Sequence, residues 1–172
     1  MNEYQEIIYE RDITELLHFT RTKNIESIKE HGLLTPKELR LRRIWLSTRN
    51  DRIRGDMING TCLSVTFYNH YLLNAFKEKY NEKFCIIIIK PEILSTKKCY
   101  FHDINAASKK FEMSSKEYLT SADAFEGMFA SKVDTKHGSR HRPPSMNSNE
   151  PTDVQAEIIV AENIEPKYII FV

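Results

Sequence analysis

The sequence predicts an α+β fold, in which short strands and short helices follow one another along the chain. Apolar or β-branched runs bounded by turn residues, such as Cys62–Phe67 and Phe84–Lys90, are typical of strands. Helical spacing is confined to brief segments such as Tyr71–Lys79, so the chain lacks the alternation of strand and long helix that builds a parallel sheet. With 172 residues and no recognisable linker or repeat, we expect one domain over residues 1–172.

Each element is expected from its local pattern. Leu16–Phe19 is typical of a short strand, and Thr22 or Asn24 can cap a following helix that stops at Gly32. The run at 84–90 is the most apolar, and we expect it to be a central strand buried on both faces. Elsewhere we expect a strand at 44–47, a loop at 49–60, a strand at 62–67, a helix at 71–79, short helices at 105–110 and 122–130, a long irregular loop at 131–150, and strands at 154–161 and 168–172.

Composition excludes several classes of protein. The 25 basic and 24 acidic residues leave a net charge of +1, so a nucleic acid would have to bind a local patch. Three scattered cysteines form no Cys-x-x-Cys pair, which argues against a zinc knuckle or redox motif and is consistent with reduced thiols in the cytoplasm. The charged N-terminus does not resemble a secretory signal, and the apolar run at 84–89 is too short to span a bilayer. We therefore expect a cytoplasmic protein without a membrane partner.

Glu157 is the most informative residue, because it stands inside an expected strand. Glutamate is depleted in strands and is rarely buried without a partner, so a functional role is one interpretation. The alternative is an edge strand with a solvated polar face. In either case, alternation puts Glu157 on one face with Gln155 and Ile159, opposite Val154, Ile158 and Val160.

Two segments upstream suggest a bound ligand, and the second of them suggests that this ligand carries phosphate. In His18-Phe19-Thr20, backbone groups at an exposed strand end can pair with a planar amide, and the Thr20 hydroxyl can reach a sugar. The alternative for His18 is a core or turn histidine. The second segment is basic and rich in arginine, whose guanidinium binds phosphate bidentately, although a charged run is usually a solvated face. Its cations are Lys37, Arg40, Arg42, Arg43, Arg49, Arg52 and Arg54.

The loop before Glu157 is also basic. It carries Lys132, Lys136, His137, Arg140, His141 and Arg142 against Asp134 and Glu150. It is either a mobile basic loop or a substrate-facing loop with local positive charge for a polyanion. His137 and His141 are spaced like helical metal ligands, but Gly138 and Ser139 separate them and prolines follow, so we expect no metal site.

Taken in order, several short motifs resemble the DarT-type DNA ADP-ribosyltransferase toxins. No single motif is decisive, whereas the ordered set over residues 15–170 is fairly specific. The motifs are Leu17-His18-Phe19-Thr20, Asn24-Ile25-x-x-Ile28, Glu30-His31-Gly32-Leu33, Asn50-Asp51 followed by Arg54, Leu63-Ser64-Val65-x-Phe67-x-Asn69, Asn105-Ala106-Ala107-Ser108, Ala124-Phe125-Glu126-x-Met128-Phe129 and Pro151-Thr152-Asp153-x-Gln155-Ala156-Glu157.

The resemblance implies an ADP-ribosyltransferase-like fold, with two packed, roughly orthogonal sheets, surrounding short helices and a cleft for NAD+. It implies transfer of ADP-ribose from NAD+ to a base of single-stranded DNA, by the toxin of a toxin–antitoxin pair whose antitoxin is of the macrodomain type. NAD+ would be a co-substrate, and no metal is implied. Tyr68 stands where the family often has proline, and the recognition loop is long and contains histidines, so the acceptor base stays open.

The resemblance also assigns roles to individual residues. Glu157 matches the catalytic glutamate, and Arg54, with Arg52 in reserve, matches the arginine that serves catalysis and the NAD+ phosphates. The residues matched to NAD+ binding are His18, Thr20, Arg52 and Asn69. Residues 131–153 correspond to the substrate-recognition loop, where Lys136, Arg140 and Arg142 are expected to bind nucleic acid.

Two alternative functions stay open. One is an enzyme of the same fold that acts on RNA, including an RNA 2′-phosphotransferase, although Glu157 within Gln-x-Glu argues against it. The other is a non-enzymatic nucleic-acid-binding module. The near-neutral net charge and the lack of RNA-binding signatures weaken that interpretation.

Overall fold

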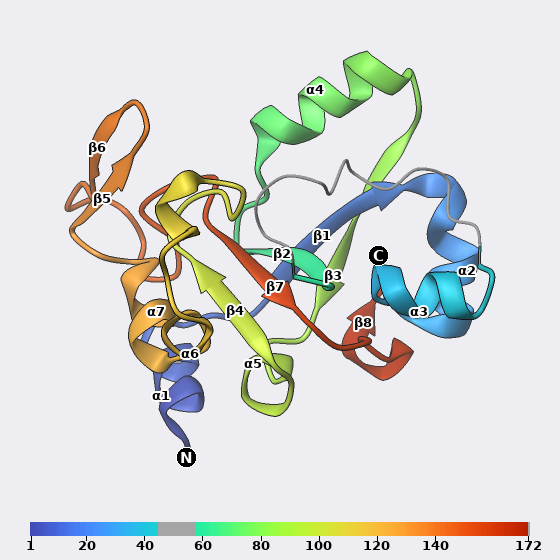
Figure 1. The fold of residues 1–172 in the computed structure, drawn as a ribbon, viewed down its shortest axis with the longest axis horizontal. Helices are drawn as coiled ribbons and strands as arrows, with labels where there is room; N and C mark the ends of the chain where they lie inside the picture. Colours follow the sequence, from blue (N-terminus) through green and yellow to red (C-terminus); the bar gives the residue numbers. More distant parts are fainter. Residues whose placement is uncertain (45–57, 172) are drawn as a thin grey trace.

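A six-stranded antiparallel sheet runs through the centre of the molecule (Figure 1). The computed structural model describes residues 1–44 and 58–171. The strand order is β4-β7-β2-β1-β3-β8, and a separate hairpin pairs β5 with β6. The strands are β1 Leu16–Arg21, β2 Thr61–Val65, β3 Phe84–Ile89, β4 Cys99–His102, β5 Lys132–Thr135, β6 Gly138–His141, β7 Glu157–Val160 and β8 Ile169–Ile170. Among the described residues, no helix is long and apolar enough to cross a membrane.

Strand β2 joins the two halves of the sheet. Its N-terminal part pairs with β7, ending at Leu63 opposite Ile158, whereas its C-terminal part pairs with β1, beginning at Ser64 opposite Leu17. Both ladders therefore stop at the middle of β2. β1 therefore has no ladder partner on β2 after Leu17, β7 has none before Ile158, and β2 alone links the two halves of the sheet.

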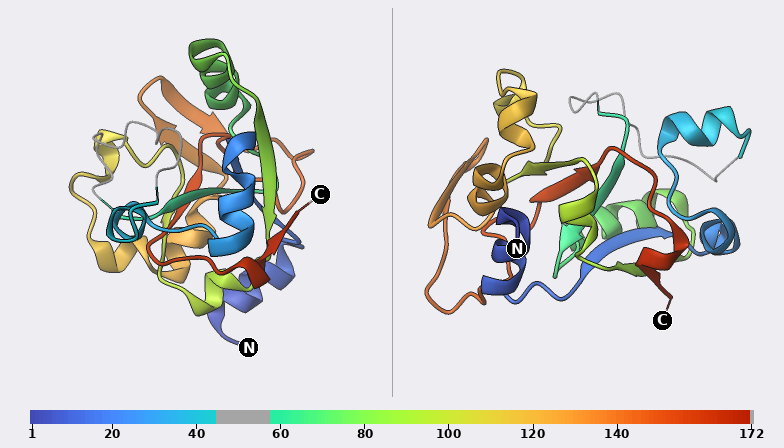
Figure 2. Two further views of the ribbon diagram at one scale, coloured as in Figure 1. Left: turned by 90° about the vertical axis from the view of Figure 1, so that its right-hand side faces the viewer. Right: turned by 90° about the horizontal axis from the view of Figure 1, so that it is seen from below.

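Short helices surround the sheet. α1, α6 and α7 pack with β4, α2 and α3 lie at the β8 end, and the β5–β6 hairpin projects at the end away from α3 (Figures 1 and 2). The core contains Leu16, Val65 and Ile158 from the sheet. The helices are α1 Glu3–Glu10, η1 Thr22–Asn24, α2 Ile25–His31, α3 Pro36–Leu41, α4 His70–Tyr80, α5 Ile93–Thr96, η2 Lys109–Phe111, α6 Lys116–Leu119, α7 Ala122–Gly127 and η3 Pro166–Tyr168.

The helix stop predicted at Gly32 is confirmed, and its cause is visible. Gly32 is the C-cap of α2 with φ of 76°, a left-handed conformation that favours glycine. A Cβ at this position would lie 2.1 Å from the carbonyl oxygen of Ile164. Leu33 bridges to Ile164 directly afterwards, so this glycine lets the chain pass closely against the segment that follows β7.

The apolar run at 84–90 forms β3, but the expectation of a central strand buried on both faces is wrong. β3 lies between β1 and the short edge strand β8, and Ile86 is 38% exposed. Four consecutive isoleucines indicate a strand, but they do not determine its position in the sheet. Here β8 pairs with only Ile88 and Ile89, so the first half of β3 forms part of the sheet edge.

The region around the predicted catalytic strand also differs from expectation. The long loop expected at 131–150 contains the β5–β6 hairpin, in which Val133 is buried. The strand expected at 154–161 is shorter, because residues 151–156 form turns and β7 begins at Glu157 itself. β7 lies between β4 and β2, which excludes the edge-strand alternative.

Other differences are smaller. The segment at 105–110 is a turn followed by the 3₁₀ helix η2, and α1, α3 and β4 form where no element was expected. The closing strand is limited to β8. The strand expected at 44–47 and the loop at 49–60 fall mostly at 45–57, outside the described residues.

Candidate active site

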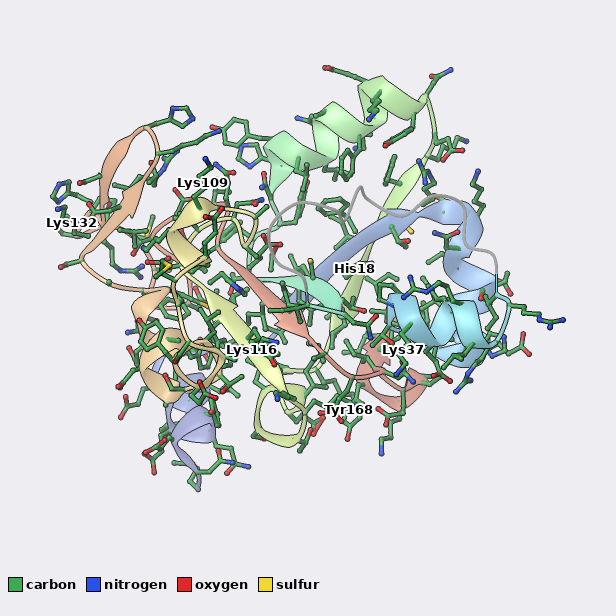
Figure 3. The ribbon with its side chains drawn as sticks, viewed as in Figure 1. His18, Lys37, Lys109, Lys116, Lys132 and Tyr168 are labelled. Carbon is green, nitrogen blue, oxygen red and sulfur yellow. The ribbon has the colours of Figure 1, made fainter. Side chains whose placement is uncertain are left out.

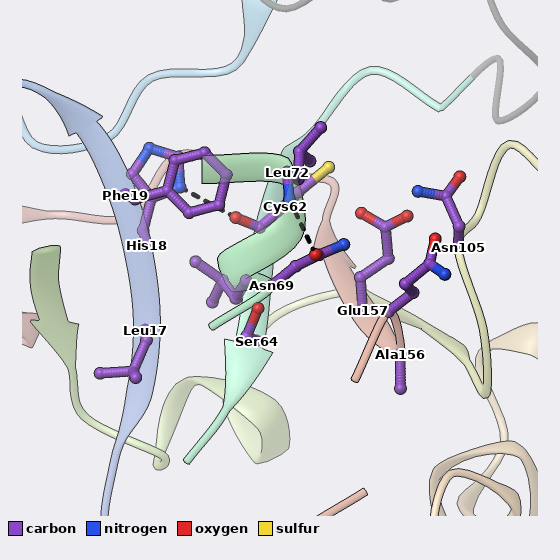
Figure 4. A pocket seen from close by; sticks show the side chains of 12 residues that line it. Leu17, His18, Phe19, Cys62, Ser64, Asn69, Leu72, Asn105, Ala156 and Glu157 are labelled. Carbon is purple, nitrogen blue, oxygen red and sulfur yellow. Dashed lines mark hydrogen bonds between the residues drawn. The ribbon is translucent and has the colours of Figure 1, made fainter. Parts of the chain in front are cut away.

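A cleft occupies the place where the ladders on either side of β2 end (Figure 4). His18 and Glu157, which lie far apart in the sequence, both border it. Residues from β1, β2, the start of α4, the 105 turn and the start of β7 line the cleft: Leu17, His18, Phe19, Cys62, Leu63, Ser64, Asn69, Leu72, Asn105, Gln155, Ala156 and Glu157.

The carboxylate of Glu157 is held by a backbone amide. Glu157 is the first residue of β7 and is half-buried. The N–H of Ala106 donates to its Oε1 at 2.6 Å, and on the neighbouring strand β4 His102 is its register partner. A charge-assisted hydrogen bond of this length fixes the carboxylate at the cleft wall.

A tight turn stands directly before Glu157 and sets its entry into the strand. Asp153 is 1% exposed. Its Oδ1 accepts the N–H of Gln155 at 2.7 Å, and its backbone carbonyl accepts the N–H of Ala156 at 2.9 Å. Thr152 anchors the other side, because its hydroxyl donates to the carbonyl of Ala130 at 2.6 Å. Asp153 thus explains why the polar run before β7 is turn and not strand.

His18 lies on the opposite side of the cleft, on β1. Its Nδ1 is 2.9 Å from the carbonyl oxygen of Cys62. Since a carbonyl can only accept, Nδ1 carries the proton, and in the neutral ring Nε2 is an acceptor. Burial lowers the pKa of His18, with the hydrogen bond to Cys62 opposing the shift. The neutral ring therefore presents a hydrogen-bond acceptor to a ligand.

Asn69 and Thr20 occupy different environments. Asn69 borders the cleft as the N-cap of α4, and its Oδ1 accepts the N–H of Leu72 at 3.0 Å, which orients its amide nitrogen away from the helix (Figure 4). Thr20 is buried, and its Oγ1 accepts from Asn24 at 3.1 Å. Thr20 does not line the described cleft, although it shares a face of β1 with His18.

The hairpin before Glu157 has two arginines that contact the protein itself. Arg140 Nε is 2.5 Å from Oδ2 of buried Asp153, so it ties β6 to the turn before Glu157. Arg142 donates to the carbonyls of Asn147 and Glu150. Lys136, in contrast, is exposed in the hairpin turn.

Sequence reasoning missed Asn105 and Ala106 as parts of the site. Their motif was noticed only as one piece of a resemblance, because the group that touches Glu157 is a backbone N–H that any residue could supply. Arg52 and Arg54 lie outside the described residues. Within residues 1–44 and 58–171, no group of three or more potential ligands could hold a metal ion, and His137 and His141 are exposed on the hairpin.

Comparison with solved structures supports the predicted fold. The chain resembles Thermosipho africanus DarTG, solved in complex with ADP-ribose, with a TM-score of 0.52 and 21% sequence identity. The match covers 91% of this chain and 42% of that chain, so the present chain spans less than half of that protein's length. The expected ADP-ribosyltransferase fold is confirmed, with the two halves of its sheet joined through β2. Comparison with curated proteins gave no match.

Comparison with protein families agrees with the fold. The family described as "ssDNA thymidine ADP-ribosyltransferase, DarT" matches residues 17–172, which include every strand except the first residue of β1. The match extends over far more than half of the chain and confirms the family predicted from the ordered motifs. The chain belongs to the DarT family of single-stranded-DNA thymidine ADP-ribosyltransferases.

Proposed function

We propose that this protein transfers ADP-ribose from NAD+ to the base of a thymidine in single-stranded DNA, with Glu157 as the catalytic residue. The observation that carries the proposal is the carboxylate of Glu157, fixed by the Ala106 amide at a cleft that His18 borders from the other side. Membership of the DarT family supports the class of reaction. The positions of Glu157 and His18 at the cleft support the roles proposed for them.

NAD+ would bind with its nicotinamide end beside β1. The neutral His18 ring offers Nε2 as an acceptor for a ribose hydroxyl, and Asn69 offers its amide nitrogen as a donor. Thr20 would contribute to NAD+ binding indirectly, by helping to hold β1 in the shape that places His18 at the cleft. Arg54, with Arg52 in reserve, is assigned to the pyrophosphate and to catalysis because guanidinium binds phosphate bidentately. ADP-ribose bound to the Thermosipho africanus protein supports this choice of ligand.

The carboxylate of Glu157 suits both halves of the reaction. As the bond between nicotinamide and ribose C1′ breaks, nicotinamide leaves with the electron pair and the ribose gains oxocarbenium character, which a nearby carboxylate stabilises. In DNA, thymine has one ring N–H, at N3. Glu157 takes this proton while N3 bonds to C1′, and the proton then passes to solvent; a general base of this kind contributes about 10²–10⁴-fold.

The β5–β6 hairpin would bind the DNA strand. A stacked base cannot reach the cleft, so the strand must be single or locally opened. Lys136 is the predicted cation best placed for a backbone phosphate, because it is exposed at the hairpin turn, whereas Arg140 and Arg142 first hold the hairpin and its neighbouring segment in place. Lys109 and Lys132 lie on the same side of the molecule, and Lys37 lies away from it (Figure 3).

In the cell, such an enzyme would act in the cytoplasm, where NAD+ and single-stranded DNA are both present. By its family it would be the toxin of a toxin–antitoxin pair, with a macrodomain-type antitoxin as partner. We further propose that residues 1–172 form a single catalytic domain.

One experiment tests the proposal. Incubate the protein with NAD+ and, in separate reactions, with thymine-containing DNA, thymine-free DNA or RNA oligonucleotides. Released nicotinamide and a mass gain of one ADP-ribosyl group on the thymine-containing strand alone are expected. A mass gain on RNA would favour the RNA-acting alternative, and tight DNA binding without nicotinamide release would favour the non-enzymatic module.

A further inference from the structure

Asn105 stands beside Glu157 and builds the turn that holds it. The Oδ1 of Asn105 accepts the N–H of Ala107 at 2.9 Å, which is the geometry of an Asx-turn. This turn directs the intervening N–H, that of Ala106, to the Oε1 of Glu157 at 2.6 Å. Asn105 also lines the cleft, so its side chain faces whatever Glu157 acts upon.

The amide nitrogen of Asn105 is a donor left for a ligand. A backbone N–H only donates, so the atom of the Asn105 side chain that accepts from Ala107 must be the oxygen, Oδ1. The other end of the amide is therefore the nitrogen, Nδ2. Nδ2 then lies on the side that faces the Glu157 carboxylate (Figure 4). In the part of the chain that the structure describes, no protein acceptor is bonded to this nitrogen.

A carboxylate acceptor next to an amide donor matches one kind of base edge. The N3–H of thymine is flanked on each side by a carbonyl oxygen, so it offers a donor beside an acceptor. Cytosine and adenine have no proton on the ring nitrogen at the corresponding edge, and both carry an amino donor where thymine has O4. Guanine does present N1–H beside O6, so this pair rejects cytosine and adenine and leaves guanine to be excluded by shape.

We infer that Asn105 donates a hydrogen bond to a carbonyl oxygen flanking N3 of the acceptor thymine. The inference rests on the proposed function and deepens it. When Glu157 takes the N3 proton, the negative charge left on the base is shared with its carbonyl oxygens. A donor already aimed at one of them stabilises that charge without reorganisation. Asn105 therefore selects the base and assists its deprotonation.

The test separates this role from support of the turn. Asn105→Ser and Asn105→Asp both keep an oxygen that can accept from Ala107, and both remove the amide donor. Transfer to an oligonucleotide with one thymine should fall about 10- to 100-fold, the loss expected for a hydrogen bond to a developing charge. Hydrolysis of NAD+ without DNA should fall at least about tenfold less than transfer in Asn105→Ser, because water needs no such donor whereas both activities need the turn that holds Glu157. Asn74→Asp, the same change at an exposed position of α4, is the matched control and should leave both rates unchanged.

Sulfur substitution on the base identifies the atom. Replacing the single thymine by 2-thiothymine or 4-thiothymine weakens one carbonyl acceptor at a time. One of the two should slow the wild type but have little further effect on Asn105→Ser, as a double-mutant cycle requires for a direct contact.

Three outcomes would overturn the inference. Transfer could persist in both variants, transfer and NAD+ hydrolysis could fall by the same factor, or neither thio-substituted base could couple to Asn105. If the wild-type protein modified no thymine at all, the proposed function would be wrong, and the inference would fall with it. The wild type is therefore tested first, before any variant is made.

Discussion

Glu157 is held at its oxygen by a backbone amide, and this makes a conservative substitution informative. In Glu157→Gln the side-chain carbonyl can still accept from Ala106, so the cleft keeps its shape while the base and the negative charge are lost. Transfer of ADP-ribose should fall by about 10²–10⁴-fold, with the loss in kcat and little change in the KM for NAD+. Turnover and NAD+ affinity should be measured together. A variant that keeps more than about a tenth of wild-type turnover would remove Glu157 from this role.

His102 shows how burial next to the site makes stability depend on pH. It is 1% exposed, packs edge-on against Phe111, and burial lowers its pKa from 6.5 to about 4, partly opposed by backbone groups of Glu157 and Tyr100. The unfolded chain therefore binds a proton that the folded protein rejects. Burial of neutral His102 therefore leaves the free energy of unfolding undiminished above pH 6.5. As the pH falls from 6.5 toward 4, this free energy decreases by at most about 3 kcal/mol.

Denaturant unfolding at several pH values checks this. His102→Gln should be less stable than wild type near neutral pH but should lose less free energy of unfolding between pH 6.5 and pH 4. His137→Gln, at an exposed position of the hairpin turn, is the matched control and should follow the wild-type pH dependence. If the free energy of unfolding changed with pH equally in wild type and His102→Gln, a group other than His102 would cause the pH dependence.

At the scale of the element, the β5–β6 hairpin combines a free-standing end with an anchored base. Lys136 is exposed at the turn, whereas Arg142 donates to the carbonyls of Asn147 and Glu150 at the other end. Lys136→Gln should reduce transfer to DNA, spare NAD+ hydrolysis, and reduce the log–log salt slope by roughly 0.7. Arg142→Gln should impair both activities, because it loosens the segment that leads to Glu157.

The matched control is Lys37→Gln, which removes the same charge on a part of the molecule away from the hairpin (Figure 3). A salt series with both activities measured side by side distinguishes the variants. If Lys37→Gln changes the salt slope and Lys136→Gln does not, the DNA binds the basic stretch that begins at Lys37 instead of the hairpin.

Elements whose causes are local could be predicted from the sequence. β1, β2 and α4 follow from apolar alternation or helical spacing, and the stop of α2 follows from Gly32. α1 and α3 carry readable caps, namely Asn2 with Gln5 and Thr35 with Glu38, but they are only 8 and 6 residues long, shorter than the stretch of sequence over which apolar periodicity identifies a helix. The hairpin could not be predicted, since contacts distant in the sequence, such as Arg140 with Asp153, hold it.

The residues of the site also divide into those with local sequence signals and those placed by contacts distant in the sequence. His18 and Glu157 were found because their side chains belong to motifs. The roles of Asn105 and Ala106 depend on a turn that brings an amide to a strand 51 residues away, and no local pattern encodes that distance. The opening of the cleft is also non-local, because it results from the two ladders of β2 ending at neighbouring residues.

At the scale of the whole molecule, α1 packs against the rest of the chain although it precedes the residues matched by the family. Ile7 and Ile13 are buried in the main core. Arg11 pairs with Glu126 and donates to the carbonyl of Ser148 at 3.3 Å, while the Ser148 hydroxyl donates back to the carbonyl of Arg11 at 3.1 Å. The N-terminal segment thus packs against the core and against the loop that leads to Glu157.

This packing predicts that residues 1–172 unfold in one cooperative transition and that α1 takes part in it. Ile7 is 6% exposed, and Ile7→Ala should lower the free energy of unfolding by about 2–4 kcal/mol, since the lost methylenes leave a cavity under α1. Tyr9 is on the same helix but 78% exposed, so Tyr9→Ala should change it by less than about 0.5 kcal/mol. Denaturant unfolding followed by far-UV and by near-UV circular dichroism should give coincident curves in wild type and both variants. If Ile7→Ala instead produced a separate early transition, with the main one unmoved, α1 would be an appendage and the domain would begin near β1.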